Sequence, residues 1–313
     1  MAVNMKGRDF LSIMDITLEE MEAIFDLTRR LKQERLAGIR HDHILAGRKL
    51  AMIFEKPSTR TRVSFEVGAY ELGMYPLYLS ARDLQLGRGE TIGDTARVLE
   101  RYVDGIMARV FEHEKLVELA NNAEIPVING LSDTFHPCQI MADLYTVLEK
   151  KGRLTGLNMV FVGDGANNIA HSLLVGCTKV GMNITIATPE GYDPDAKIVE
   201  YAKGQAARMH CEVKIARDPY EAVKDADVIY TDVWVSMGDE AEAEKRKRDF
   251  ANYQVNTKLL SEAKEDVIVL HCLPAHRGEE ITDEVMDGPH SVVFDEAENR
   301  LHVQKAIMAM LIR

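Results

Sequence analysis

Three hydroxyl side chains alternate with two arginines in the run Ser58-Thr59-Arg60-Thr61-Arg62. An apolar run typical of a strand precedes them at 49–54, and residues with near-helical spacing follow at 63–71. The start of a helix presents free backbone N–H groups and the positive end of the helix dipole, which favour an anion. The arginine fork matches the oxygens of a phosphate or carboxylate. A plain helix cap needs only one hydroxyl, so the run predicts a site for phosphate or a similar oxyanion.

Other side chains that could take part in chemistry also lie at the ends of predicted strands or the starts of predicted helices. Arg109 ends an apolar run, His136 and Gln139 stand three residues apart at the start of a helical pattern, and Cys272 follows another apolar run. Taken singly, these residues are ordinary: a strand-end arginine, a capping histidine and an inert buried thiol. The ends of strands and the starts of helices nevertheless meet at the ligand-binding edge of an open α/β sheet. Their shared position predicts one site in a cleft between two domains.

A glycine-rich run, Gly163-Asp164-Gly165-Ala166-Asn167-Asn168, follows a predicted strand and opens a helix. It resembles the dinucleotide fingerprint G-x-G-x-x-G, which would indicate a dehydrogenase. However, Asn168 replaces the third glycine, and the acid nearest to the end of the next strand, Glu190, lies past a proline. Two asparagines at a helix start suit a small polar ligand better than a nicotinamide cofactor.

The elements that must position these residues alternate between strands and helices in both halves of the chain. Each half therefore predicts a doubly wound parallel sheet, and we expect an α/β fold with one domain at 1–150 and a second at 151–313. A terminal helix at about 300–313 is expected to pack back on the first domain, with Arg300 just before it. The strands are predicted at 49–54, 75–79, 105–109, 126–129, 158–162, 183–187, 212–215, 227–230, 267–270 and 291–294.

Composition excludes several classes of function. The chain has 313 residues and a net charge of −12, which disfavours a nucleic-acid partner. It contains no apolar run of membrane-spanning length and no apolar signal core near Met1, so we expect a cytoplasmic protein without a membrane partner. The four cysteines form no C-x-x-C pair, which argues against a zinc site or a disulfide framework.

Four motifs together resemble those of the aspartate/ornithine carbamoyltransferase family: Ser58–Arg62, His136-Pro137-Cys138-Gln139, the segment from Asp232 to Gly238, and His271-Cys272-Leu273-Pro274. The resemblance covers nearly the whole chain, from about Phe10 to the C-terminus. The first two motifs are shared by both branches of the family. The other two resemble the ornithine branch.

The resemblance implies transfer of the carbamoyl group of carbamoyl phosphate to the δ-amine of L-ornithine, giving L-citrulline and phosphate. It implies these contacts for carbamoyl phosphate: Ser58, Thr59, Arg60, Thr61, Gln85, Arg109, His136, Pro137, Cys138, Gln139, Cys272, Leu273 and Arg300. The implied ornithine contacts are Asn168, Asp232, Ser236 and Met237. The implied catalytic residues are Arg60, Arg109, His136, Asp232 and Cys272.

The chemistry implied by the resemblance needs no metal and no cofactor, because carbamoyl phosphate is already activated. The family's common unit is a trimer, so a homotrimer or an assembly of trimers is expected. Three alternatives remain at this point: a relative acting on another amine such as putrescine or an acylated ornithine, a nucleotide-dependent dehydrogenase, and a non-catalytic binder of a phosphate ligand. Asp232 and Ser236-Met237 suit a free amino acid and disfavour the first.

Overall fold

The computed structural model describes residues 3–84, 89–236 and 240–313. The chain divides into two compact units, one made of residues 1–141 and 298–313 and the other of residues 142–297. Both passages from one unit to the other fall inside helices, namely α5 (Pro137–Lys151) and α12 (Val293–Leu311). Within the described part of the chain, no helix combines the length and the apolar character of a membrane span.

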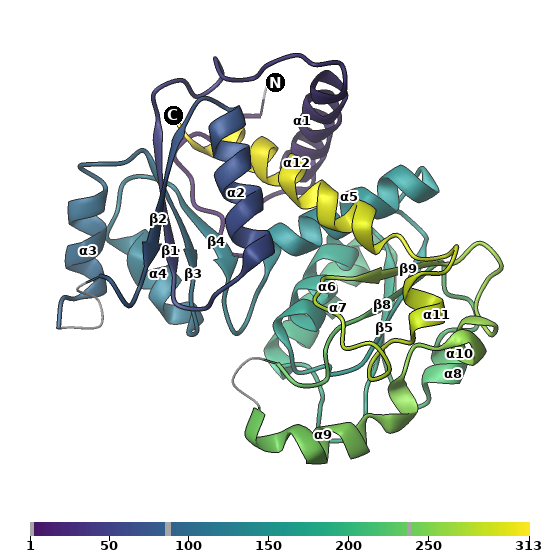
Figure 1. The fold of residues 1–313 in the computed structure, drawn as a ribbon. Coiled ribbons are helices and arrows are strands. Elements are labelled where there is room, and N and C mark those ends of the chain that lie inside the picture. Colours follow the sequence, from purple (N-terminus) through teal and green to yellow (C-terminus); the bar gives the residue numbers. More distant parts are fainter. Residues whose placement is uncertain (1–2, 85–88, 237–239) are drawn as a thin grey trace. The chain divides into compact units, whose positions relative to one another are not determined.

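The first unit contains a four-stranded parallel sheet in the order β2-β1-β3-β4 (Figure 1). Its core includes apolar side chains of α3 and α4 packed on β1, β3 and β4, and Figure 1 shows α1 and α2 on the other side of the sheet. The elements are η1 (Ile13–Asp15), α1 (Leu18–Leu36), β1 (Lys49–Phe54), α2 (Thr59–Glu71), β2 (Tyr75–Ser80), α3 (Ile92–Leu99), β3 (Gly105–Arg109), α4 (His113–Asn121) and β4 (Val127–Leu131).

The second unit contains a five-stranded parallel sheet in the order β7-β6-β5-β8-β9. Figure 1 shows α6 and α7 on one face of this sheet and α8, α10 and α11 on the other. The elements are β5 (Asn158–Val162), α6 (Asn168–Lys179), β6 (Asn183–Ala187), α7 (Ala196–Met209), β7 (Val213–Ala216), α8 (Pro219–Ala222), β8 (Val228–Thr231), η3 (Glu240–Glu242), α9 (Ala243–Asp249), η4 (Ala251–Tyr253), α10 (Thr257–Leu260), β9 (Ile268–His271) and α11 (Asp283–Met286).

In both sheets the strand order reverses at the first strand. β2 lies on one side of β1 and β3 lies on the other, and β6 and β8 lie on opposite sides of β5 in the same way. Ligands of open α/β sheets bind outside the carboxyl ends of the strands at such reversals. The sequence-based prediction of an α/β fold with two doubly wound parallel sheets is confirmed.

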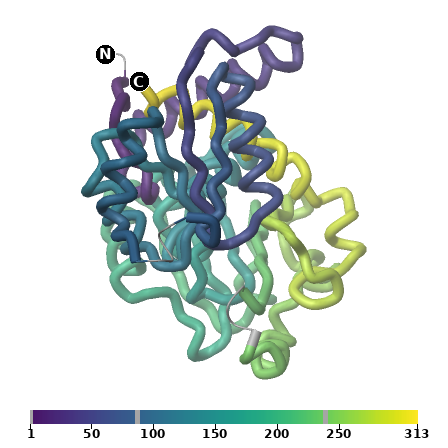
Figure 2. The backbone as a smooth tube through the Cα atoms, turned by 60° about the vertical axis from the view of Figure 1, so that its left-hand side comes forward, coloured from purple at the N-terminus to yellow at the C-terminus, as the bar shows by residue number. Residues whose placement is uncertain are grey.

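The two ends of the chain lie side by side in the first unit. Figure 2 shows the purple N-terminal segment beside the yellow end of α12. The backbone N–H of Gly7 donates to the carbonyl of Leu311 at 2.8 Å, and Lys6 Nζ donates to the carbonyl of Ala309 at 2.7 Å. The end of α12 is therefore anchored by the segment that leads into the first helices.

Two predictions about the last part of the chain are wrong. Residues 291–294 do not form a strand, because Ser291 makes only an isolated bridge with Val269 and helix α12 begins at Val293. Asp295 and Glu296 lie in the first turn of this helix, where the helix dipole favours negative charge, and this outweighs the strand preference of the apolar run. Arg300 consequently lies within α12 and does not precede the final helix.

Candidate functional site

The anion-binding run lies at the start of α2, as its sequence predicts. Ser58 is the N-cap, and its hydroxyl accepts a hydrogen bond from the backbone N–H of Thr61 at 3.2 Å. Thr61 is fully buried, whereas Arg60 is half-buried and Thr59 is exposed. A helix start of this kind presents backbone donors and positive potential to an anion.

The two arginines of the run have different surroundings. Arg62 is paired with Glu66 one turn further along α2 at 3.2 Å, and its guanidinium lies 3.8 Å from the centre of the Tyr78 ring. Arg60, in contrast, is close enough to His136 to affect its pKa. The structure thus assigns Arg60 to the charged cluster around His136 and Arg62 to a contact with the neighbouring edge strand.

Arg109 is the last residue of β3, and His136 lies in the segment that follows β4. Arg109 ends β3 beside Phe54 of β1, and only 5% of its surface is exposed. His136 lies after β4, directly before the first residue of α5. Burial lowers the pKa of His136 well below its usual value, and three guanidinium charges lower it further. These charges belong, in decreasing order of effect, to Arg300, Arg109 and Arg60.

The protonation of His136 follows from these surroundings. At neutral pH the imidazole is uncharged, so it can donate a hydrogen bond to a carbonyl without adding to the positive charge of the cluster. The cationic charge comes from arginines, which stay protonated. A chain with a net charge of −12 therefore still holds a local positive region that suits an anion.

Arg300 reaches this cluster from the far end of the chain. Its Nη2 donates to the hydroxyl of Thr61 at 3.0 Å, and both side chains are buried. Helix α12 packs against α2 at Gly68, where side-chain atoms of Lys305 and Met308 lie about 3.1 to 3.2 Å from the position of an added Cβ. This close helix contact brings Arg300 to the start of α2.

The segment that carries His136 is held by buried polar contacts. Asn129 Nδ2, in β4, donates to the carbonyls of Leu11 and Phe135 at 2.8 and 3.2 Å. Pro137 is the first residue of α5, where its missing N–H costs nothing. Cys138 and Gln139 follow in the first turn and are fully buried, with the Cys138 thiol donating to the carbonyl of Asn129 at 3.4 Å.

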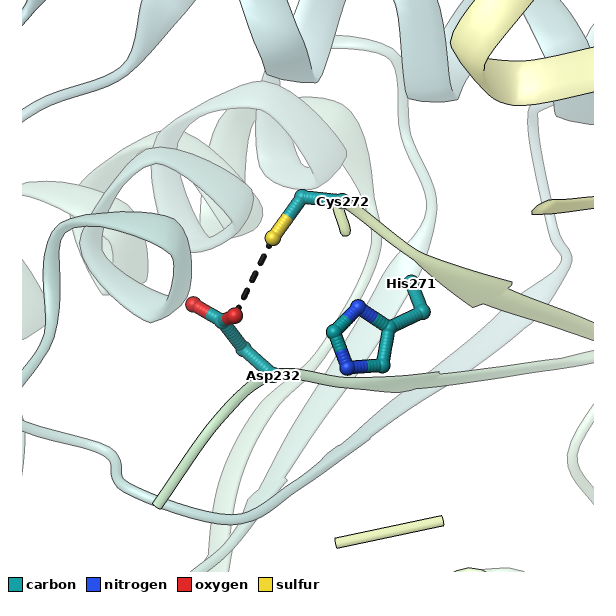
Figure 3. Close-up of side chains that lie close together, drawn as sticks. All are labelled: Asp232, His271 and Cys272. Atoms are coloured by element: carbon teal, nitrogen blue, oxygen red, sulfur yellow. Dashed lines mark hydrogen bonds between the residues drawn. The ribbon is translucent and has the colours of Figure 1, made fainter. Parts of the chain in front are cut away.

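In the second unit, Asp232 and Cys272 meet at the ends of neighbouring strands. Asp232 follows β8, Cys272 follows β9, and the Cys272 thiol donates to Asp232 Oδ1 at 3.1 Å (Figure 3). Burial and then the carboxylate of Asp232 raise the pKa of Cys272 well above its usual value. Burial also raises the pKa of Asp232. The cysteine is therefore a neutral hydrogen-bond donor at neutral pH and not a thiolate nucleophile.

Asn167 joins the same group from the glycine-rich turn. It is the N-cap of α6, where its side-chain oxygen accepts from the backbone N–H of Ala170 at 2.8 Å. Its Nδ2 donates to Asp232 Oδ2 at 3.4 Å. Asn168, named in the prediction, is the first residue of α6 and is partly exposed beside this contact.

His271 fixes the backbone of the Cys272–Leu273 segment. Its Nδ1 accepts from the backbone N–H of Leu273 at 2.9 Å, and its Nε2 bonds Glu280 Oε1 at 3.0 Å. Leu273 has φ of 58°, a left-handed conformation that is unfavourable for a leucine. The backbone N–H of His271 donates in turn to Glu296 Oε2 at 2.9 Å. This network holds the segment in one conformation.

Asp232, His271 and Cys272 also offer potential metal-ligand atoms within 4.8 Å of one another. Figure 3 shows the three side chains converging. However, Nδ1 of His271 accepts from Leu273, and its Nε2 is bonded to Glu280, so a metal would have to displace one of these hydrogen bonds. The group fits the orientation of an amine better than it fits a metal ion.

The structure brings the predicted residues together in two groups, one in each unit. The first unit holds Ser58, Thr59, Arg60, Thr61, Arg109, His136, Pro137, Cys138, Gln139 and Arg300. The second unit holds Asn168, Asp232, Ser236, Cys272 and Leu273. Gln85 and Met237 lie outside the described residues.

Sequence reasoning noted Asn167 beside Asn168 at a helix start but did not foresee its contact with Asp232. It missed the other supporting residues of the second group. Glu280 and Glu296 carry no local signal, because each reaches His271 only through the tertiary fold.

Both halves of the chain match models of one protein family. The carbamoyl-P binding domain of aspartate/ornithine carbamoyltransferase matches residues 8–149, and the Asp/Orn binding domain matches residues 155–311. The chain is 60% identical over 312 residues to an ornithine carbamoyltransferase of Thermococcus kodakarensis, covering 100% of this chain and 98% of that protein. It is 56% identical to a Pyrococcus furiosus protein named as an anabolic ornithine carbamoyltransferase, with coverage of 100% and 98%.

Solved structures agree with these matches. The ornithine carbamoyltransferase structure from Pyrococcus furiosus is 56% identical, has a TM-score of 0.96 and is covered over 99% of each chain. The ornithine transcarbamoylase structure from Giardia lamblia, at 31% identity and 97% coverage of each chain, still has a TM-score of 0.88. On these matches and the motifs that carry them, the chain belongs to the aspartate/ornithine carbamoyltransferase family.

Proposed function

We propose that this protein transfers the carbamoyl group of carbamoyl phosphate to the δ-amine of L-ornithine, giving L-citrulline and phosphate. The observation that carries the proposal is the contact between Cys272 and Asp232, supported by Asn167. A buried carboxylate can pair with the positive charge of a primary ammonium group. Together with the neutral thiol, it can also orient the nitrogen for attack. The relatives named above are ornithine carbamoyltransferases, which supports ornithine as the amine.

The first step of the proposed reaction is attack by the amine. An alkylammonium group has a pKa of roughly 10.4, so the δ-amine must lose a proton before it can attack. Asp232 and Cys272 orient the nitrogen and help to move that proton. A C–N bond then forms to the carbamoyl carbon, and negative charge grows on the carbonyl oxygen. Thr61, Arg109 and His136 stabilise this charge.

The second step is loss of phosphate. The C–O bond to phosphate breaks, and the phosphate takes the electron pair. The nitrogen keeps the carbamoyl group and gives up its second proton to the departing phosphate. Arg60 and the start of α2 receive the leaving phosphate, whose charge they were already balancing. Because the reaction requires the two substrates to meet, both groups of residues are needed for each turnover.

We also propose the biosynthetic direction, a cytoplasmic location and a homotrimer. The Pyrococcus furiosus relative is named as anabolic, which supports the direction toward arginine. All four cysteines are free thiols, a state that the reducing cytoplasm maintains. The exposed face of α2 and the edge strand β2 carries Val63, Tyr70, Tyr75 and Tyr78, which are 38–73% exposed. Such an apolar surface beside an edge strand suits burial against a second copy of the chain.

The proposal is tested by citrulline formation from carbamoyl phosphate, with ornithine, putrescine, acetylornithine and aspartate compared as acceptors. We expect ornithine to give the highest kcat/KM. A higher value for putrescine or acetylornithine would contradict the choice of ornithine, and no product with any amine would contradict the transferase activity.

The role of Asp232 is tested by Asp232→Asn, with Asp225→Asn as the matched control on the exposed approach to the same strand. Loss of the carboxylate charge should weaken ornithine binding at least tenfold, because a charged hydrogen bond contributes about 1.5–3 kcal/mol. Carbamoyl phosphate binding should stay within twofold. Calorimetry measures each ligand separately, and equal losses for both ligands would show that Asp232 supports the fold only.

A further inference from the structure

Helix α9 follows the Asp232–Ser236 segment and is unusually rich in charged residues. Its sequence, Ala-Glu-Lys-Arg-Lys-Arg-Asp, resembles an ordinary solvated helix. One side chain departs from this pattern, because the Arg246 side chain is only 12% exposed, while Lys245, Lys247 and Arg248 are exposed. A guanidinium is rarely buried unless it is paired, so its partners indicate what it does.

Arg246 contacts two segments of the ornithine half of the site. Its Nη1 donates to Asp164 Oδ2 at 2.7 Å and to the carbonyl of Trp234 at 3.2 Å. The guanidinium carbon also lies 5.4 Å from the ring centre of Tyr192, whose hydroxyl donates to Asp249 of the same helix at 2.8 Å. The orientation of Arg246 is therefore constrained from three sides.

Each partner of Arg246 is close in sequence to a residue of the proposed amine site. Trp234 lies midway between Asp232 and Ser236, so its carbonyl belongs to the backbone that carries both. Asp164 follows β5, and its Oδ1 accepts from the backbone N–H of Ala166 at 2.9 Å, immediately before Asn167. Arg246 thus links the turn after β5 to the turn after β8.

The link matters because the contact between these two turns is weak. Asn167 Nδ2 and Asp232 Oδ2 are 3.4 Å apart, which is long for a hydrogen bond. Trp234 stacks on Phe250 with ring centres 6.1 Å apart, which orders the side chain of Trp234 but does not bond its carbonyl. The bonds of Arg246 are shorter and charge-assisted: the one to the Asp164 carboxylate is 2.7 Å long, and the one to the Trp234 carbonyl, at 3.2 Å, holds the backbone directly.

We propose that Arg246 is a positioning residue for the amine substrate: it sets the spacing between the Asn167 turn and the Asp232–Ser236 segment. The inference rests on the proposed function, since it assigns ornithine recognition to these two turns. Arg246 itself touches no substrate. Its effect should therefore fall on ornithine far more than on carbamoyl phosphate, because most of the implied carbamoyl phosphate contacts belong to the other unit.

The experiment compares Arg246→Gln, Arg246→Lys and the control Arg248→Gln, an exposed arginine two residues further along the same helix. For Arg246→Gln we expect KM for ornithine to rise at least tenfold, with KM for carbamoyl phosphate within twofold of the unmutated value. Arg246→Lys keeps the charge beside Asp164 and should recover part of the loss. Arg248→Gln should match the unmutated enzyme.

A further variant separates positioning from simple charge balance. Arg246→Gln strands the buried carboxylate of Asp164, which can destabilise the fold. The double variant Asp164→Asn/Arg246→Gln removes that charge and should recover thermal stability, while the ornithine KM stays raised. Recovery of both would contradict the inference, because Arg246 would then only neutralise Asp164. An unchanged ornithine KM in Arg246→Gln, or equal rises for both substrates, would also overturn it.

These outcomes are distinct from failure of the proposed function. If the unmutated protein forms no citrulline, the transferase proposal is wrong. If it forms citrulline and Arg246→Gln keeps its ornithine KM, the proposed function stands and only the positioning role is lost.

Discussion

At the scale of single residues, the group around His136 and the group around Asp232 each combine charged side chains with a neutral hydrogen-bonding side chain. His136 is kept neutral by burial and by three guanidinium charges, and Cys272 is kept as a thiol by burial and by Asp232. The guanidinium of Arg60, by contrast, supplies a positive charge. Each group therefore has a defined protonation state near neutral pH in which it can receive and orient a substrate.

The difference between Arg60 and Arg62 gives a matched pair of variants. Arg60→Ala should lower kcat/KM for carbamoyl phosphate at least tenfold, since one charge-assisted bond contributes about 1.5–3 kcal/mol. Arg62→Ala should stay within threefold, because Arg62 is engaged by Glu66 and Tyr78. Steady-state kinetics at low carbamoyl phosphate measures both. Near-normal activity of Arg60→Ala would show that Arg60 does not bind carbamoyl phosphate.

At the scale of elements, α12 has more buried polar side chains than any other described helix. Its first turn carries Glu296, which accepts from the backbone N–H of His271 and contacts the hydroxyl of Tyr230 at 3.3 Å. Further along, Lys305 is fully buried, donates to Glu71 at the end of α2 at 2.6 Å and contacts His41 at 3.0 Å. The helix therefore supports residues of both groups through hydrogen bonds as well as packing.

Glu296 makes the stability of the protein depend on pH in a defined direction. Burial and then the charge of Asp143 raise its pKa well above the usual value, so the folded state prefers the protonated carboxyl. That contribution is complete below the unfolded pKa of about 4.3 and is lost as the pH rises toward the folded pKa. Glu296→Gln imitates the protonated form and loses this dependence.

We therefore expect the stability of Glu296→Gln relative to the unmutated protein to increase from pH 5 to pH 8. The limiting slope for one group is about 1.4 kcal/mol per pH unit. Urea unfolding at several pH values measures the difference, with the exposed Glu284→Gln as control. A stability difference that does not change with pH would mean that Glu296 is ionised in the folded protein.

At the scale of the whole molecule, a net charge of −12 coexists with an exposed apolar surface on α2 and β2. A negative charge of this size works against a phosphate substrate at long range. The local arginines overcome this only near the start of α2. The apolar surface lies on the same helix, so the proposed assembly and the proposed phosphate binding both involve α2.

The proposed trimer predicts complementation between two inactive variants. The family resemblance implies that Gln85 serves the site of a neighbouring subunit. If it does, Arg60→Ala and Gln85→Ala subunits each retain what the other lacks. Both should be poor alone, and the mixture should regain part of the normal activity after joint unfolding and refolding. Each variant refolded with itself is the control. Activity equal to the mean of the two controls would show that each subunit builds its own site.

Much of the site could be predicted from the sequence because its signals act over a few residues. Ser58 caps α2 three residues from Thr61, Pro137 starts α5 directly after His136, and Asn167 caps α6 after a glycine-rich turn. Together with the alternation of strands and helices, these local patterns led to the fold and the family, and both are confirmed. The roles of the individual residues stay predictions.

The contacts that complete each group were decided by tertiary structure alone. Arg300 meets Thr61 across 239 residues, Arg246 meets Asp164 across 82, and Cys272 meets Asp232 across 40. The charged run of α9 resembles a solvated surface in sequence, and the apolar run at 291–294 resembles a strand. Propensity and capping extend over about one helical turn, whereas burial and pairing depend on which distant segment packs alongside, and that is determined only when the whole chain has folded.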